Sequence, residues 1–319
     1  MRKLSALFVA AALAATLAGC TSSTPPEPES TCTTGPKAGA SSALVTATGA
    51  ADAQPTAVNF PTPIVSTDTQ VSTITAGTGA TIEPDDIALV NAFAYSGEDG
   101  SPITSGSLLM QAKASDVRFS GLVECSTVGS RLAVTIPASS VLNTTDGSAS
   151  TSKTTAVLIL DVTARYLGKA NGAEQVPQPG FPSVVTADNG QPGLTILNQA
   201  PPTELKYSVL KKGSGATVKK GDSVILNYTG VLWDERTVFD STWQNGSATA
   251  AIAAPLATGA DGTTTGLVDG FATALVGQKV GSQVIVIVPP ANGFGSNAPP
   301  TGVTATSTLV YVFDVLGIQ

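Results

Sequence analysis

The aromatic side chains in the last third of the chain are the residues best suited by type and spacing to do chemistry. Aromatic residues make up only 5% of the 319 residues, and the sequence contains no histidine. The lack of histidine excludes Ser-His-Asp and Cys-His catalysis and histidine-ligated metal sites. Because aromatic residues are so scarce, any group of them is worth locating. Those in the last third include Tyr228, Phe239, Phe271, Phe294 and Tyr311, and Asp240 directly follows Phe239.

The segments that must position these side chains are mostly predicted strands. They are short, β-branched runs bounded by Gly, Pro or Asp, at 223–232, 283–288 and 308–315. A short helix is expected over 267–275, with Phe271 and Leu275 on one face and Gly277 placed to end it. Several antiparallel strands with one short helix to cover them predict an α+β fold.

The body of the chain repeats a series of landmarks in the same order. Residues 77–82, 86–91, 128–137 and 155–161 parallel 213–218, 222–227, 280–289 and 308–314. This order indicates a duplication, with copies at 42–167 and 182–319. Residues 168–181 are rich in Gly, Gln and Pro and suit a linker between the copies.

Five motifs of the second copy follow one another in a recognisable order. They are Tyr228-Thr229-Gly230, Phe239-Asp240-Ser241, Leu267-Val268-Asp269-Gly270-Phe271, the loop 290–295, and Thr308-Leu309-Val310-Tyr311. In this order they resemble the FKBP-type peptidyl-prolyl cis-trans isomerase domain. The resemblance covers about 205–319 well and the first copy weakly. It implies two tandem FKBP-like domains, each an antiparallel β-sheet wrapped on one short helix.

The activity that this resemblance implies is isomerisation of Xaa-Pro peptide bonds. Rotation about a peptide bond faces a barrier of about 18–20 kcal/mol because resonance keeps the amide planar. Twisting lowers the amide dipole, so an apolar pocket favours the twisted form. This chemistry needs no cofactor and no metal ion, which suits a chain without histidine.

The resemblance also assigns expected roles to individual residues. Phe271 would form the floor of the pocket, Asp240 would meet the carbonyl of the twisted amide, and the Val268 backbone amide would hold a substrate carbonyl. The expected catalytic residues are Tyr228, Asp240, Phe271 and Phe294. The expected substrate-binding residues are Phe239, Leu267, Val268, Val303 and Tyr311.

The second copy departs from the family pattern at three places. Phe294 stands where the family has a tyrosine, which removes a hydroxyl donor to the substrate. No arginine follows Phe239-Asp240-Ser241, so Asp240 is expected to lack a partner. Residues 249–252 lack a phenylalanine that often lines the pocket. These departures leave the rate and substrate preference open.

The first copy has lost most of the pocket residues. Ala92, Ile103-Thr104 and Leu158 stand at the positions of Tyr228, Phe239-Asp240 and Tyr311, and Phe119 alone falls opposite Phe271. A single aromatic residue kept in this way is more often part of a core than of a site. We therefore expect the first copy to be an inactive FKBP-like domain that serves as a spacer or a chain-binding surface.

The beginning of the chain predicts export and anchoring. Residues 1–19 combine a basic start with a short apolar run, and Leu17-Ala18-Gly19-Cys20 resembles a bacterial lipobox. Cys20 is then the lipidated residue, 20–41 is a Pro/Ser/Thr-rich tether, and the protein sits on the outer face of the bacterial cell membrane. A plain secretory signal is the alternative. An oxidising compartment makes a disulfide between Cys32 and Cys125 plausible.

The net charge of −7 and the low isoelectric point argue against a nucleic-acid partner. The expected partners are proline-containing polypeptides among exported proteins, the membrane through the lipid on Cys20, and macrolide FKBP ligands. Two other functions stay open from the sequence. One is a chaperone or peptide-binding module with little or no isomerase activity, and the other is a structural spacer that lifts something off the membrane.

Overall fold

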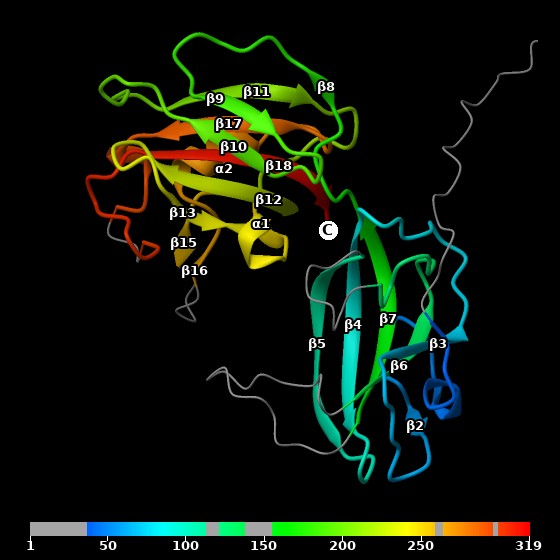
Figure 1. Ribbon diagram of the computed structural model, residues 1–319. Helices are drawn as coiled ribbons and strands as arrows, with labels where there is room; N and C mark the ends of the chain where they lie inside the picture. The colour runs from blue at the N-terminus through cyan, green and yellow to red at the C-terminus, as the bar shows by residue number, and fades with distance from the viewer. Residues whose placement is uncertain (1–36, 113–120, 138–154, 259–263, 296–298) are drawn as a thin grey trace, which may run out of the picture. The chain divides into compact units, whose positions relative to one another are not determined.

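The computed structural model describes residues 37–112, 121–137, 155–258, 264–295 and 299–319 (Figure 1). Strands dominate these residues, and the helices are few and short. The α+β class predicted from the sequence is confirmed. No helix in these ranges is long and apolar enough to cross a membrane.

A five-stranded antiparallel sheet forms the first half. Its order is β3 (Gln70–Thr75), β6 (Arg131–Ile136), β7 (Ala156–Tyr166), β4 (Ile87–Ser96) and β5 (Pro102–Gln111). The 3₁₀ helix η1 (Ser42–Leu44) precedes the hairpin of β1 (Thr46–Thr48) and β2 (Ala57–Asn59).

A seven-stranded antiparallel sheet forms the second half. Its main path is β13 (Val238–Ser241), β12 (Ser223–Leu232), β18 (Leu309–Ile318), β17 (Gln283–Val288), β11 (Lys206–Lys212) and β8 (Ala173–Glu174), and β14 (Thr249–Ile252) also pairs with β12. Two small pairs are β9 (Ser183–Thr186) with β10 (Pro192–Thr195), and β15 (Ala257–Thr258) with β16 (Thr264–Thr265). The helices are α1 (Thr242–Asn245), α2 (Asp269–Leu275) and the 3₁₀ helix η3 (Pro290–Asn292).

The two sheets share one strand order. In the first, β3-β6-β7-β4-β5 are neighbours, and in the second β11-β17-β18-β12-β13 follow the same sequence of connections. Each sheet also has a two-stranded hairpin before its first long strand. This shared topology supports the interpretation of the chain as two copies of one domain.

The central strands of the second sheet are buried on both faces. All six residues of β17 are buried, and so are nine of the ten residues of β18. One face packs against α2 in a cluster around Phe271, and the other packs against the hairpin β9–β10 in a cluster around Trp233 (Figure 1). A strand buried on both faces reads as a continuous apolar run, which is why these strands are conspicuous in the sequence.

Helix α2 lies close to the sheet because of a glycine. A Cβ atom built on Gly270 would come within 2.7 Å of the Val288 side chain. A side chain at this position would therefore push the helix away from β17 and displace the next residue, Phe271. The close packing of α2 against β17 therefore explains why this motif has a glycine before Phe271.

A buried polar pair lies at the same register position in both sheets. In the first, Arg131 donates two 2.7 Å hydrogen bonds to Asp161 and further bonds to carbonyls in the hairpin β1–β2 region, those of Thr48, Gly49, Ala50 and Ala53. In the second, Gln283 Nε2 donates to Asp314 Oδ1 at 2.8 Å, and the Ala170 amide donates to Oδ2 at 2.8 Å. Burial raises the pKa of Asp314 from 3.8 to about 6.

The elements agree closely with the strands predicted for the second copy. The strands expected at 223–232 and 283–288 have these limits in the structure, whereas the last strand starts at Leu309 and runs on to Ile318. Helix α2 begins at Asp269, two residues after the predicted start, because Val268 is its N-cap. Helix α1 was not predicted. β8 lies inside the segment expected to be a linker and pairs with β11.

Several sequence predictions fall outside the described residues. These are the signal segment 1–19, the lipidated Cys20, the tether up to residue 36, Cys32, and the position of Phe119, where the helix of the first copy is expected. Cys125 is disulfide-bonded. Since Cys20 and Cys32 both lie outside the described ranges, the pairing of Cys125 with Cys32 stays a prediction.

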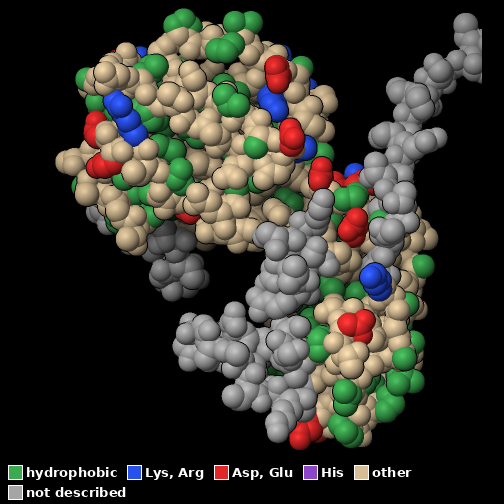
Figure 2. Space-filling view, viewed as in Figure 1, with side chains coloured by type: hydrophobic (Ala, Val, Ile, Leu, Met, Phe, Trp, Pro, Cys, Tyr) green, Lys and Arg blue, Asp and Glu red, His purple; other side chains and the backbone are tan. Residues whose placement is uncertain are grey.

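Charged side chains are sparse on the surface. In the space-filling view, uncharged polar and apolar atoms cover most of the face shown, with isolated acidic and basic side chains (Figure 2). This surface agrees with a composition in which only 12% of residues are charged. Uncharged polar groups therefore supply much of the contact with water.

Candidate functional site

The aromatic side chains named from the sequence come together on the α2 face of the second sheet. Tyr228 lies on β12 opposite Phe313 of β18, and Gly230 lies two residues further on, opposite Tyr311. Because side chains alternate along a strand, Tyr228 shares a face with position 230, and Tyr311 shares a face with Phe313. The ring centroids of Tyr228 and Tyr311 are 5.5 Å apart.

Gly230 makes room for two of these rings. A Cβ atom at this position would lie 2.8 Å from the Tyr311 ring and 3.0 Å from the Phe239 ring. Real Cβ atoms do not approach other atoms this closely, so any other residue would force one ring to move. The glycine of the Tyr-Thr-Gly motif is therefore required by the packing of the pocket.

Phe239 and Asp240 both reach the aromatic cluster from β13 although they are neighbours in the chain. The register between β12 and β13 shifts at this point: Asp240 pairs with Gly230, and Val238 pairs with Val231. A bulge of this kind re-aims side chains that would otherwise alternate. Phe239 meets Tyr311 edge-on, with centroids 5.5 Å apart, while Asp240 reaches the hydroxyl of Tyr228.

Phe271 lies in the first turn of α2 at the centre of the aromatic group. Its ring centroid is 4.3 Å from that of Tyr311, 5.3 Å from Phe313 and 6.3 Å from Phe294. Phe271 and Tyr311 are both buried, and Phe294 is partly exposed. Phe271 is thus buried at the centre of the aromatic group, and its role as the floor of a substrate pocket stays a prediction.

The N-terminus of α2 offers an unused donor beside this floor. Val268 is the N-cap of α2, and its carbonyl accepts from the amides of Phe271 and Ala272. Its own backbone amide donates no hydrogen bond within the described part of the chain. Because a buried amide without a partner is unfavourable, a carbonyl of a bound chain would stabilise it, and this role of Val268 stays a prediction.

The remaining predicted residues pack around the same cluster. Val268 and Val303 are buried in it, and Leu267, Tyr228, Phe239 and Phe294 are partly buried against it. All nine residues predicted to form the site are therefore brought together. Ala251 of β14 also contacts the cluster, as a small side chain in the strand where the family often has a phenylalanine.

Phe313 is a member of the aromatic group that the sequence did not single out. It stacks on Tyr311 with an interplanar angle of 11° and a centroid distance of 5.2 Å. It is buried beneath Tyr228 and Phe271, so it supports the pocket rather than facing solvent. The signal for it was present, because Phe313 follows Tyr311 by two residues on one strand face.

The expectation that Asp240 lacks a partner is wrong. The hydroxyl of Tyr228 donates to Oδ2 of Asp240 at 2.7 Å. Burial and the Asp240 carboxylate both raise the pKa of Tyr228 above its ordinary value of 10, so its proton stays on the phenol. Burial also raises the pKa of Tyr311. The site therefore presents phenolic hydroxyls and one carboxylate in an apolar setting.

Comparison with known proteins agrees with this site. The family model described as FKBP-type peptidyl-prolyl cis-trans isomerase matches residues 215–316. The chain is 31% identical over 117 residues to the FKBP-type peptidyl-prolyl cis-trans isomerase FkpA of Escherichia coli K12, which is 37% of this chain and 38% of that protein. It is 26% identical over 160 residues to the outer membrane protein MIP of Legionella longbeachae, covering 50% and 61% of the two.

The match to a smaller relative covers nearly all of that relative. The chain is 30% identical over 118 residues to a probable FK506-binding protein of Corynebacterium glutamicum, which is 36% of this chain and 87% of that one. Among solved structures, FkpA from Escherichia coli aligns at 25% identity with a TM-score of 0.30, over 43% of this chain and 51% of that one. Through its second domain, the chain belongs to the FKBP-type peptidyl-prolyl cis-trans isomerase family.

Proposed function

We propose that the protein is a peptidyl-prolyl cis-trans isomerase that acts on Xaa-Pro bonds of exported proteins. The observation that carries the proposal is the convergence of Tyr228, Asp240, Phe271 and Tyr311 in one partly open aromatic cluster. One matched relative is named as a peptidyl-prolyl cis-trans isomerase and another as a probable FK506-binding protein. Since the chain covers only 38% of the length of FkpA, the activity of the whole protein is part of the proposal.

The pocket acts by changing the environment of the substrate amide. A prolyl ring enters over Phe271 and leaves its water shell, with Tyr228, Phe239 and Tyr311 as walls. Twisting the Xaa-Pro bond breaks the amide resonance and lowers the amide dipole, so the apolar surroundings stabilise the twisted state relative to the planar one. The pocket accelerates the reaction only to the extent that it stabilises the twisted amide more than the planar amide.

Two polar groups orient the chain during the twist. The free amide of Val268 donates to a carbonyl of the substrate backbone and fixes one side of the rotating bond. Asp240 faces the other side with its carboxylate held by Tyr228. Leu267, Val303 and the ring of Phe294 enclose the residues next to the proline. Macrolides that bind FKBP proteins are expected to compete for the same surface.

A second candidate function is a peptide-binding module with little isomerase activity. The observation that favours it is Phe294, which supplies a ring to the pocket but has no hydroxyl to donate to the substrate. In this case the pocket would hold proline-containing chains without lowering the rotation barrier. A turnover measurement separates the two functions.

We also propose that the protein works on the outer face of the bacterial cell membrane, anchored by a lipid on Cys20. Support comes from the lipobox-like sequence before Cys20 and from the relative named outer membrane protein MIP. Mass spectrometry of the protein from membranes tests this: a diacylglyceryl-modified N-terminal Cys20 is expected, and an unmodified N-terminus would contradict it.

The decisive experiment measures cis-trans exchange of a short Xaa-Pro peptide with the full chain. Phe271→Leu keeps an apolar side chain under the pocket but removes the ring, and we expect at least a tenfold loss of kcat/KM, or about 1.4 kcal/mol of transition-state stabilisation. Phe93→Leu is the matched control, since Phe93 is buried in the core of the first sheet. No acceleration by the folded wild-type chain would leave the binding module as the function.

A further inference from the structure

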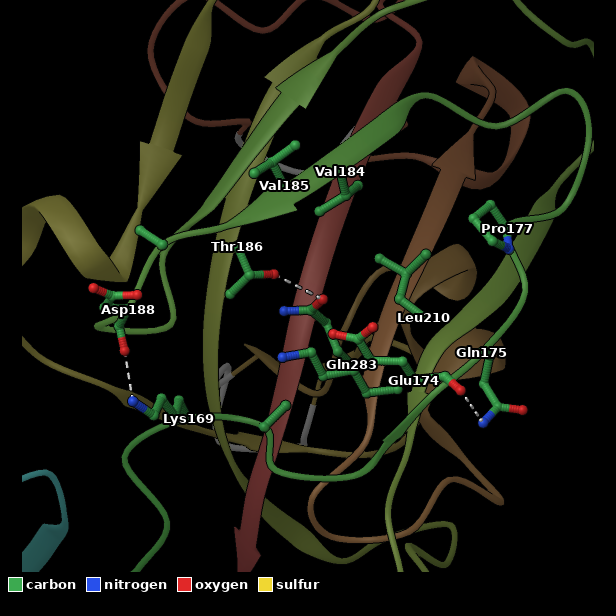
Figure 3. Close-up of a pocket in the computed structure, with 13 residues that line it drawn as sticks. Lys169, Glu174, Gln175, Pro177, Val184, Val185, Thr186, Asp188, Leu210 and Gln283 are labelled. Atoms are coloured by element: carbon green, nitrogen blue, oxygen red, sulfur yellow. Dashed lines mark hydrogen bonds between the residues drawn. The ribbon is translucent and has the colours of Figure 1, made fainter.

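A concave surface lies on the opposite face of the second sheet from the aromatic cluster. It is a groove of about 520 Å³ between strand β9 on one side and β8 with β11 on the other. Val184 and Thr186 come from β9, Leu210 comes from β11, and Gln283 of β17 forms part of the floor (Figure 3). None of these residues belongs to the aromatic site.

Strand β9 presents a free backbone edge in this groove. Among the strands in the described part of the chain, β9 pairs with β10 alone, in a register that places Thr186 opposite Pro192 and Val184 opposite Leu194. The Ala187 amide donates to the Gln191 carbonyl, so pairs 187/191 and 185/193 are the hydrogen-bonded ones. The backbone groups of Val184 and Thr186 therefore point away from β10, which agrees with proline, a residue without an N–H, at position 192.

These outward groups have no partner in the structure. No hydrogen bond to the backbone of Val184 or Thr186 is made by any residue within the described ranges. The edge of β8 across the groove differs, because the Gln175 side chain donates to the carbonyls of Ala173 and Glu174. Of the two edges, β9 is the one open to another strand.

The walls of the groove favour an uncharged, extended chain. Lys169 and Lys211 are balanced by Glu174 and Asp188, so the groove carries no net charge that would select an ion. Pro177, Val184 and Leu210 supply apolar contacts between these polar groups. At the rim, Val185 of the lining is 75% exposed, and Val176, which lies between the lining residues Gln175 and Pro177 in the chain, is 80% exposed, so both offer apolar surface to a partner.

We propose that this groove binds an extended segment of an incompletely folded polypeptide, which adds to β9 as a third strand. The backbone of the segment pairs with Val184 and Thr186, and its apolar side chains contact Leu210 and Pro177 inward and Val176 and Val185 at the rim. A two-stranded hairpin is marginal by itself, so a third strand is favourable for it. The proposal rests on the proposed function in taking the partner to be the client polypeptide.

Amide hydrogen exchange tests where the segment binds. The full chain is mixed with a permanently unfolded protein, reduced and carboxymethylated ribonuclease, and exchange is followed residue by residue. We expect the amides of Val184 and Thr186 to gain at least tenfold protection, because they become donors to the added strand. Protection confined to the aromatic cluster would overturn the proposal.

Substitutions separate this groove from the isomerase site. In V176D/V185D, both exposed rim side chains become charged, and we expect at least tenfold weaker binding of the unfolded ribonuclease, measured by fluorescence anisotropy. V65D is the matched control, because Val65 is 70% exposed on the first half of the chain. Val184→Pro removes an outward N–H without breaking a β9–β10 hydrogen bond and is expected to weaken binding as well. Unchanged affinity in these variants would overturn the proposal.

A short Xaa-Pro peptide keeps the two proposals apart. It is too short to fill both sites, so V176D/V185D is expected to accelerate its exchange as the wild type does. One outcome would contradict the isomerase function and support the groove. In it, the wild type does not accelerate exchange of the peptide but binds the unfolded ribonuclease, and V176D/V185D has lost this binding. Another outcome would overturn the proposal. If the wild type sediments as a dimer and does not bind ribonuclease, and V176D/V185D sediments as a monomer, the groove binds a second copy of this chain.

Discussion

The hydroxyl of Tyr228 donates a 2.7 Å hydrogen bond to the carboxylate of Asp240, across adjacent strands of the second sheet. No arginine follows Phe239-Asp240-Ser241 to orient Asp240, and the hydroxyl of Tyr228 takes this part instead. A phenol differs from a guanidinium because it brings one donor and no charge. The contact therefore fixes the position of Asp240 without bringing a positive charge next to it.

Removing this hydroxyl should lower both the activity and the stability of the protein. In Tyr228→Phe the ring contacts with Tyr311 remain, and Asp240 loses its donor. A hydrogen bond to a charged group contributes roughly 1.5–3 kcal/mol, and the partial exposure of Tyr228 puts the expected loss of unfolding free energy at the lower end. We expect kcat/KM on the Xaa-Pro peptide to fall about tenfold. Urea unfolding and the exchange assay measure both, and an unchanged kcat/KM would rule out a positioning role.

Restoring the hydroxyl missing at position 294 should increase turnover. Phe294 meets Phe271 edge-on, at a centroid distance of 6.3 Å, and a tyrosine there keeps this ring contact. The added hydroxyl can donate to a substrate carbonyl, and one such bond corresponds to roughly 0.5–1.5 kcal/mol. Phe294→Tyr is expected to raise kcat/KM several-fold. A fall in kcat/KM without loss of stability would show that the phenylalanine itself is preferred.

Asp314 should make the protein less stable as the pH rises through the range 4 to 6. Burial raises its pKa from 3.8 to about 6 in the folded state, so the folded state binds more protons than the unfolded state in this window. The contribution to the unfolding free energy is greatest below pH 3.8 and is lost as the pH rises through about 6. At 1.36 kcal/mol per pKa unit, the loss is about 3 kcal/mol.

The variant Asp314→Asn isolates this effect. Asparagine stays neutral, so the difference between the wild-type and variant unfolding free energies is expected to change between pH 4 and 6 and to be constant above pH 6.5. The substitution also alters the hydrogen bonds from Gln283 and Ala170, but it does so at every pH. These bonds therefore add a constant to the difference in unfolding free energy. A pH-independent difference, measured by denaturant unfolding, would contradict the raised pKa.

The buried pair of Arg131 and Asp161 should be costly to break. Arg131 is fully buried and supplies donors to Asp161 and to four carbonyls near the hairpin β1–β2. Arg131→Gln reproduces the residue found at this position in the second sheet, but leaves Asp161 without its cation. Removing one partner of a buried pair costs about 3–5 kcal/mol.

Arg165 provides the control for this change. It pairs with the buried Asp86, but Arg165 itself is partly exposed and the Glu83 amide also donates to Asp86, so its removal is expected to cost less. Calorimetry of Arg165→Gln and Arg131→Gln is therefore expected to show a small and a large loss, respectively, in the same domain. Equal losses would mean that burial does not determine the effect.

The sequence predicted the second domain well because its strands are buried on both faces. The limits of β12 and β17 follow from β-branched runs that end at Gly, Pro or Asp, and the glycines at 230 and 270 belong to motifs that the packing requires. Eight of the nine predicted site residues meet in one apolar cluster, and Asp240 joins them through its hydrogen bond with Tyr228. The order and spacing of the motifs predict this arrangement because each motif has a fixed position in the strand pairing of the sheet.

The partner of Asp240 could not be predicted in the same way. The contact with Tyr228 depends on the register of β12 against β13 and on the bulge at Phe239, and neither leaves a local signal in the sequence. The same holds for β8, a two-residue strand in a segment whose Gly, Gln and Pro content is typical of a linker. A single sequence therefore does not predict which residues pair when they lie far apart in the chain.

The attachment of this segment to the second sheet decides where the polypeptide can be cut. The pairing of β8 with β11 and the bond from the Ala170 amide to Asp314 make residues 170–174 part of the domain that follows them. A fragment that starts at residue 182 would leave the edge of β11 bare and remove one of the two donors to a buried carboxylate. Recombinant work on the isomerase domain alone should begin near residue 168.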